Sequence, residues 1–288
     1  MIPLTDLVRD IDLAKPLPPT ATRLARIAQE QRADIGEIVT VMRYDPSLTA
    51  HLLECADDAA AVNEPARRSA DVQEAVLRLG IPKVLELAVL QHAAGTLRAA
   101  LPMYGLGEDD LWRHAIASAL AVEILERMSA VEFPPGTMTA ALLHDIGKAV
   151  LAGQARDKQP AELSAAFGSK QKVFSQAECE ILGFGHAMIG ARLADRWALG
   201  PEVVAAIRKH HDLGAAESPA TDAVRVANLA AKVAGCGLGA EGLNVAGDAG
   251  ACGRLGLTRQ DFEYLCAEVY SRLPRALQVA EIMARPAA

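Results

Sequence analysis

The chain has 288 residues, of which 51% are hydrophobic and 23% are charged, so it is long enough to bury a substantial core. Its formal net charge of −7 excludes a general attraction to nucleic-acid phosphates or to an anionic membrane, and an aromatic content of 4% argues against a base-stacking platform. The N-terminal segment MIPLTDLVRDIDLAKPLPP lacks the apolar run of a signal peptide, and no uncharged apolar stretch reaches the length of a membrane span. We therefore expect a cytoplasmic protein with neither nucleic-acid nor membrane partners.

The periodicity of the chain predicts an all-α fold. Alanine and leucine dominate, and apolar residues recur at three- and four-residue spacing rather than alternating. Proline, glycine and aspartate interrupt this pattern and separate one helix from the next. In chain order, the expected helices cover residues 20–28, 35–42, 47–53, 72–79, 84–97, 111–128, 138–151, 176–183, 186–197, 203–211, 223–233 and 261–284.

The helices are expected to form two lobes. Residues 100–107 mix proline and glycine with apolar side chains, which is typical of a connection. Residues 1–105 then form an N-terminal helical lobe, and residues 106–288 form a helical core. Seven glycines in residues 235–253 predict a loop or a poorly ordered excursion, and a C-terminal helix follows it. This loop does not match a dinucleotide-binding fingerprint, because no strand precedes it and the glycine spacing is wrong.

Five of the seven histidines lie in the second lobe. They are His114, His144, His186, His210 and His211, and Asp145 directly follows the second of them. Imidazole and carboxylate groups suit first-row transition metals, and ligands so far apart in sequence can meet only through a specific fold. The two other histidines, His51 and His92, have no partners at matching spacing, so we expect structural roles for them.

The segment LLHDIGK is the densest part of this pattern. Adjacent residues on a helix diverge by about 100°, but His144 and Asp145 differ in length and could still reach one ion. Gly147 is disfavoured in a helix by about 1 kcal/mol relative to alanine, which indicates close packing or binding there. Lys148 could contact a substrate phosphate as a point charge; the alternative is a solvated helix residue.

LLHDIGK, preceded by WRH and followed by GFGHAMIGARLADRWALGPEVVAAIRKHH, resembles the HD superfamily of metal-dependent phosphohydrolases and specifically its HDOD branch. LPPT, YDPSLTAHLLECAD and VQEAVLRLGIPKVLELAVL in the N-terminal half resemble that branch independently. The resemblance covers residues 17–232. It implies an N-terminal helical lobe packed on an HD-like helical core.

The resemblance also implies a set of metal ligands. One ion would bind His114, His144 and Asp145, and Asp145 would bridge to a second ion held by His186, His210 and His211. The HD pattern then expects an aspartate where Asn228 stands, and a neutral amide is a weaker ligand than a carboxylate. Asp222, six residues earlier, is a poor substitute. We therefore expect one divalent ion (Mn, Fe, Ni or Zn) or none, rather than two, with Asp145 and Lys148 as candidate catalytic residues.

Members of the HDOD branch are generally regarded as regulators in bacterial signal transduction, and they often lack a full ligand set. The resemblance thus implies a signalling protein that binds a protein partner or a small phosphorylated ligand in a histidine-rich cleft, with weak or no catalysis. The alternative is a metal-dependent phosphohydrolase, acting as a phosphodiesterase or nucleotide phosphatase, in which bound metal generates hydroxide from water. HHDLGAAESPA lacks the Gly-Tyr-Pro motif of the related HD-GYP phosphodiesterases, which disfavours cyclic-di-GMP hydrolysis.

Overall fold

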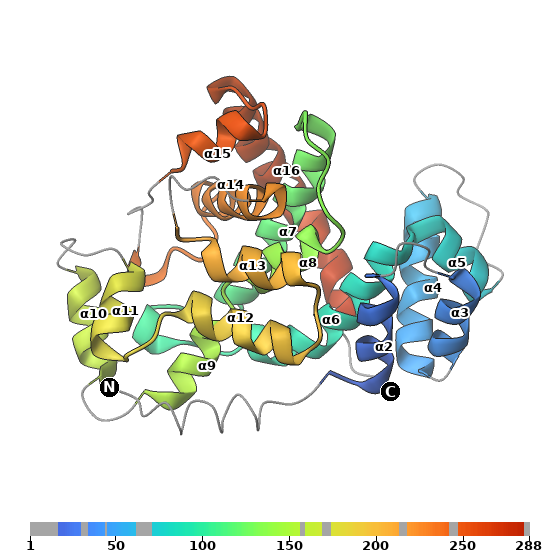
Figure 1. Cartoon of the computed structure of the whole chain (residues 1–288), viewed down its shortest axis with the longest axis horizontal. Coiled ribbons are helices and arrows are strands. Elements are labelled where there is room, and N and C mark those ends of the chain that lie inside the picture. Colours follow the sequence, from blue (N-terminus) through green and yellow to red (C-terminus); the bar gives the residue numbers. More distant parts are fainter. Residues whose placement is uncertain are drawn as a thin grey trace.

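The described part of the chain consists of helices and turns without a strand, which confirms the expected all-α class (Figure 1). A computed structural model describes residues 17–29, 34–43, 45–61, 71–155, 159–168, 174–212, 218–241 and 247–284. Within these ranges, an isolated antiparallel bridge joins Leu101 to Leu106 in the connection between the expected lobes. None of the helices in these ranges combines the length and apolar character needed to cross a bilayer.

The N-terminal helices gather at one end of the molecule, and the last of them, α6, extends toward its middle (Figure 1). They are α2 (Pro19–Ile27), α3 (Ile35–Arg43), α4 (Pro46–Ala61), α5 (Val72–Leu79) and α6 (Ile81–Leu97). Helix α6 contacts α2, α4 and α5 and also contacts α7, α8 and α16 of the remaining chain. A short 3-10 helix, η1 (Pro102–Tyr104), follows α6. The expected lobe division at 105/106 falls directly after η1 and stays a prediction.

The remaining helices follow η1 in the chain. They are α7 (Asp110–Met128), α8 (Thr137–Leu143), α9 (Gly147–Gln154), α10 (Gln159–Gly168), α11 (Phe174–Ile181), α12 (His186–Arg196), α13 (Pro201–Lys209), α14 (Pro219–Val233), the 3-10 helix η2 (Gly239–Glu241), α15 (Ala249–Arg254) and α16 (Arg259–Ala284). Helix α7 packs against α8, α14 and α16, while α12 packs against α9 and α13. These contacts bring the start of α12 and the end of α13 toward the turn between α8 and α9.

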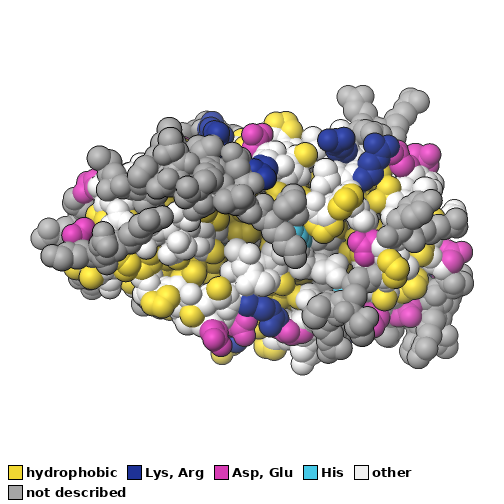
Figure 2. Space-filling view, turned by 90° about the horizontal axis from the view of Figure 1, so that it is seen from below, with side chains coloured by type: hydrophobic (Ala, Val, Ile, Leu, Met, Phe, Trp, Pro, Cys, Tyr) yellow, Lys and Arg dark blue, Asp and Glu magenta, His cyan; other side chains and the backbone are white. Residues whose placement is uncertain are grey.

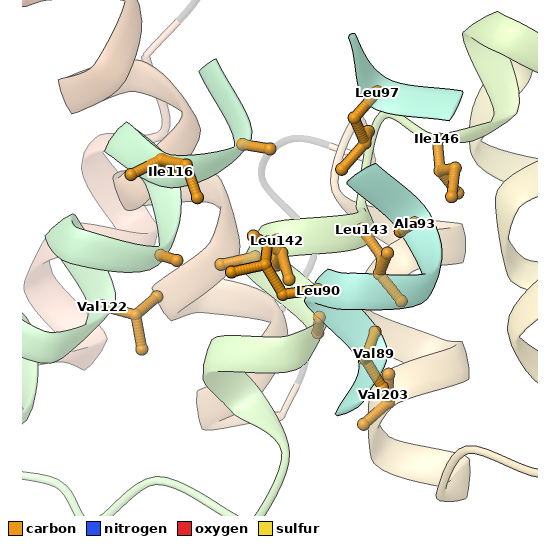
Figure 3. Packing of buried hydrophobic residues seen from close by; sticks show 14 of the residues in the cluster. Val89, Leu90, Ala93, Leu97, Ile116, Val122, Leu142, Leu143, Ile146 and Val203 are labelled. Carbon is orange, nitrogen blue, oxygen red and sulfur yellow. The ribbon is translucent and has the colours of Figure 1, made fainter. Parts of the chain in front are cut away.

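A continuous hydrophobic core supports this arrangement. Leu90 of α6, Ile116 of α7 and Leu142 of α8 are buried in one cluster (Figure 3). Burying a leucine or isoleucine side chain contributes roughly 1.5–3 kcal/mol. The α6–α7–α8 contact therefore holds the two halves of the chain together and fixes the position of the residues that follow α8.

Two expectations about local structure are wrong. The expected helix 138–151 is broken into α8 and α9 by a turn at residues 144–146, where Ile146 N–H donates to the Leu143 carbonyl (3.0 Å). The expected loop 235–253 contains η2 and α15, because Asp248 caps α15 by accepting a hydrogen bond from Ala251 N–H (3.0 Å). Residues 242–246 of that segment lie outside the described residues. Helix α10 also has no counterpart among the expected helices.

Candidate metal centre

The fold gathers the five expected histidines around Asp145. His114 comes from α7, His144 and Asp145 from the turn after α8, His186 from the first residue of α12, and His210 and His211 from the end of α13. All are buried except His211, which is partly exposed. Histidine is accordingly visible only as small patches between other side chains on the face shown in Figure 2.

The two oxygens of Asp145 face different histidines. Oδ2 lies 3.6 Å from Nε2 of both His114 and His144. Oδ1 lies 3.1 Å from Nε2 of His186 and 3.7 Å from Nε2 of His210. We define the first subsite as His114, His144 and Asp145, and the second subsite as Asp145, His186, His210 and His211. Within each subsite, one ligand atom of every residue lies within 4.8 Å of the others.

The imidazole nitrogens that face away from the centre are occupied by hydrogen bonds. Nδ1–H of His114 donates to the Cys236 carbonyl (3.1 Å), and those of His144 and His210 donate to the carbonyls of Ala141 and Ile207 (2.7 Å each). A carbonyl can only accept, so these bonds assign the proton to Nδ1 and leave the Nε2 lone pair facing inward. The Nε2 atoms of His114 and His144 are 3.2 Å apart as a result.

Burial keeps most of these imidazoles neutral. It lowers the pKa of His114 to about 3, and it also lowers the pKa of His144. The pKa values of His210 and His211 lie well below the ordinary value of 6.5 for the same reason. Because a metal binds the neutral form of imidazole, the site holds these four side chains ready for coordination.

Glu178 on α11 is a site residue that the sequence reasoning missed. Its buried carboxylate accepts hydrogen bonds from Nδ1–H of His186 (2.7 Å), from the His186 backbone N–H (2.8 Å) and from the Tyr104 hydroxyl (2.8 Å). Although burial acts to lower the pKa of His186, the carboxylates of Glu178 and Asp145 raise it to about 9. A signal was present, because Glu178 shares an apolar helix face with Ile181 and Leu182.

Lys148 lies inside the site and is not a solvated helix residue. Its side chain is buried, and its Nζ donates to Asp145 Oδ2 at 2.7 Å. Burial alone would raise the pKa of Asp145, but the Lys148 ammonium and the surrounding histidines lower it well below its ordinary value. Asp145 therefore stays ionised. A contact between Lys148 and a substrate phosphate stays a prediction.

Two glycines bring backbone against the site. A Cβ on Gly147 would lie 2.0 Å from the His186 carbonyl oxygen and 2.7 Å from the Gly190 nitrogen, so α9 can approach α12 only without a side chain there. Gly237 has a φ of +66°, and a Cβ on it would lie 2.7 Å from the His114 ring. The expectation of close packing at Gly147 thus agrees with the structure.

The donor set fits a divalent transition metal. Inward imidazole nitrogens, an ionised carboxylate and outer N–H groups held by carbonyl or carboxylate oxygens are the usual features of such sites. Asp145 Oδ1 is buried and has no partner with hydrogen-bond geometry, although His186 is near it. An ion in the second subsite would satisfy that oxygen.

One family of known proteins matches most of this chain. The family model of the HDOD domain matches residues 14–213, which is more than half of the chain. The chain belongs to the HDOD family.

The chain is also similar to individual proteins and solved structures. An uncharacterized protein of Treponema pallidum (strain Nichols) is 25% identical over 210 residues, which cover 70% of this chain and 38% of that protein. A crystal structure named for a signal transduction protein of Marinobacter aquaeolei VT8 matches with a TM-score of 0.74 and 27% identity, covering 94% of this chain and 60% of that one. A structure named for a phosphohydrolase of Shewanella amazonensis SB2B has a TM-score of 0.70 at 20% identity, covering 96% and 98% of the two chains, and shows the shared fold. This HDOD chain therefore spans only part of the first two relatives.

Within the described residues of this HDOD protein, α14 contributes no carboxylate to either subsite. Asn228 is buried, and its Oδ1 has no hydrogen-bond partner. Asp222 instead forms ion pairs with Arg254 (2.7 Å) and Arg225 (3.2 Å). Arg225 also donates to the Lys209 carbonyl at the end of α13. Asp222 thus supports the turn that carries His210 and His211 and is absent from both groups of candidate ligands.

Proposed function

We propose that this protein is a regulatory HDOD module of bacterial signal transduction whose histidine cluster holds a divalent transition metal (Mn, Fe, Ni or Zn). Through this centre it binds a small phosphorylated ligand or a signalling partner, with weak or no catalysis. The observation that carries the proposal is the inward convergence of five Nε2-presenting histidines on the ionised Asp145. A purely structural role would not explain five imidazoles packed so closely around one carboxylate.

Electrostatics support an anionic ligand. Lys148 and Lys232 are both buried, so their charges are poorly screened by solvent. Besides burial and neighbouring side chains, these two ammonium groups lower the pKa of His114 in the first subsite and of His211 in the second. Their positive charge therefore reaches both subsites. A bound metal would add Lewis acidity toward a phosphate oxygen, and the lysines would add charge.

The absent carboxylate supports weak or no catalysis, because Asn228 is neutral where the HD pattern expects an aspartate. A metal-dependent phosphohydrolase is the second candidate. It is favoured by Asp145, whose two oxygens face both subsites as a bridging carboxylate would. The name of the Shewanella amazonensis structure agrees with this candidate, but its 20% identity supports only the fold.

Metal analysis and a turnover assay on the same preparation separate the two candidates. Protein purified without chelator is loaded with Mn²⁺ and assayed with bis-p-nitrophenyl phosphate and p-nitrophenyl phosphate. We expect bound metal, background turnover, and loss of the metal in Asp145→Ala. The matched control is Asp195→Ala, an exposed aspartate of α12. Turnover that Asp145→Ala abolishes and Asp195→Ala preserves establishes the phosphohydrolase instead, and a failure of wild-type protein to bind metal overturns both candidates.

A further inference from the structure

Lys148 occupies an unusual place in a metal centre. It comes three residues after Asp145, across the turn that separates α8 from α9. Its Nζ bonds to Oδ2 of Asp145, which is the oxygen that faces His114 and His144. The buried ammonium thus pairs with the carboxylate oxygen that belongs to the first subsite.

The two subsites differ in the negative charge available to them. The second subsite has the Asp145 carboxylate directly and the Glu178 carboxylate behind His186. The first subsite has the same Asp145 oxygen pair, two imidazoles and, at the position expected for its last ligand, the neutral Asn228. Because the Lys148 ammonium balances the charge of Asp145, the remaining ligands of the first subsite are neutral. A divalent cation therefore gains little there, and the nearby ammonium repels it.

We propose that the Lys148 ammonium replaces the first metal ion electrostatically, so that this chain binds one divalent ion, in the second subsite. Lys148 neutralises Asp145 Oδ2, and the buried ion pair removes the need for a cation between His114 and His144. The inference rests on the proposed metal-binding function and deepens it by assigning the stoichiometry and the position of the ion.

The stoichiometry of Mn²⁺ binding, measured by native mass spectrometry and metal analysis on folded protein, tests this. Wild type is expected to bind one ion, and Asn228→Asp alone is expected to remain at one because Lys148 is still present. The double variant Asn228→Asp with Lys148→Met is expected to bind two. Its matched control, Asn228→Asp with Lys148→Arg, keeps the positive charge and is expected to bind one.

Two ions in wild type or in Asn228→Asp overturn the inference while leaving the metal-binding function intact. One ion in the folded Lys148→Met double variant also overturns it. No ion in wild type instead refutes the proposed function itself.

The position of the ion gives a second test that does not depend on the double variants. His186→Gln is expected to abolish Mn²⁺ binding, and His114→Gln is expected to retain one ion with an affinity within about threefold of wild type. Retention by His186→Gln together with loss in His114→Gln places the ion in the first subsite and overturns the inference.

Discussion

Oε2 of Glu178 lies 2.7 Å from Nδ1 of His186, and both side chains are fully buried. This contact holds the imidazole with Nε2 toward Asp145. Tyr104, at the end of η1, donates to the other oxygen of the same carboxylate (2.8 Å). The connection between the N-terminal helices and the core is therefore linked by hydrogen bonds to a candidate metal ligand.

Glu178→Gln is expected to weaken Mn²⁺ binding by roughly 10–100-fold, because losing such an outer carboxylate makes the ligand less basic and less well oriented. Competition with a fluorescent chelator measures the change. Glu180→Gln, an exposed position on the same helix, is the control and should leave the affinity within about twofold of wild type. Equal affinities for the two variants would show that Glu178 does not position His186.

Gly147→Ala is expected to lower the free energy of unfolding by about 1–3 kcal/mol, because the new methyl group would meet backbone atoms of α12. Mn²⁺ affinity should fall as His186 moves. Gly153→Ala, also on α9, has no atom within 4 Å of the added Cβ and should be neutral or stabilising by up to about 1 kcal/mol. Urea unfolding of both variants measures the difference, and a Gly147→Ala protein as stable as Gly153→Ala contradicts the packing argument.

Gly237→Ala tests whether the ion lies in the first or in the second subsite. The left-handed backbone and the contact with the His114 ring are both expected to destabilise the protein. Gly235→Ala is the control, because Gly235 also has a positive φ but no atom near the added Cβ. Gly237→Ala should be the less stable of the two by about 1 kcal/mol or more. Mn²⁺ affinity should stay within about threefold of wild type, and a larger loss would indicate that His114 holds the ion.

The stability of the metal-free protein should depend on pH through His186. The pKa of His186 is raised from 6.5 to about 9 in the folded state. The stabilisation of the folded state by the protonated imidazole is therefore fully present below pH 6.5 and is lost as the pH rises through 9. The loss is about 3 kcal/mol at most. Urea unfolding at pH 6.5, 8 and 9.5 measures it, and Glu178→Gln should make the dependence shallower. Unchanged stability across this range would show that His186 is neutral in the folded protein.

Local sequence patterns were sufficient for the fold class. The three- and four-residue recurrence of apolar side chains depends only on helical geometry, so it predicts helices without knowledge of their partners. The resemblance to HDOD proteins similarly identified His114, His186 and Asp145 before their distances were known. Their roles as ligands stay predictions, although the fold brings the side chains together.

Tertiary packing decided the rest. The helix expected at 138–151 breaks at residues 144–146, and the next residue, Gly147, lies with its backbone against His186, which is 39 residues away in sequence. Glu178 becomes a partner of the site because Tyr104 and His186 meet around it. Lys148 is buried on Asp145 because that same turn directs it inward. The sequence alone determined which residues could act as helix formers and ligands; only the packing of distant helices decided which charges face each other, because that depends on contacts no local pattern contains.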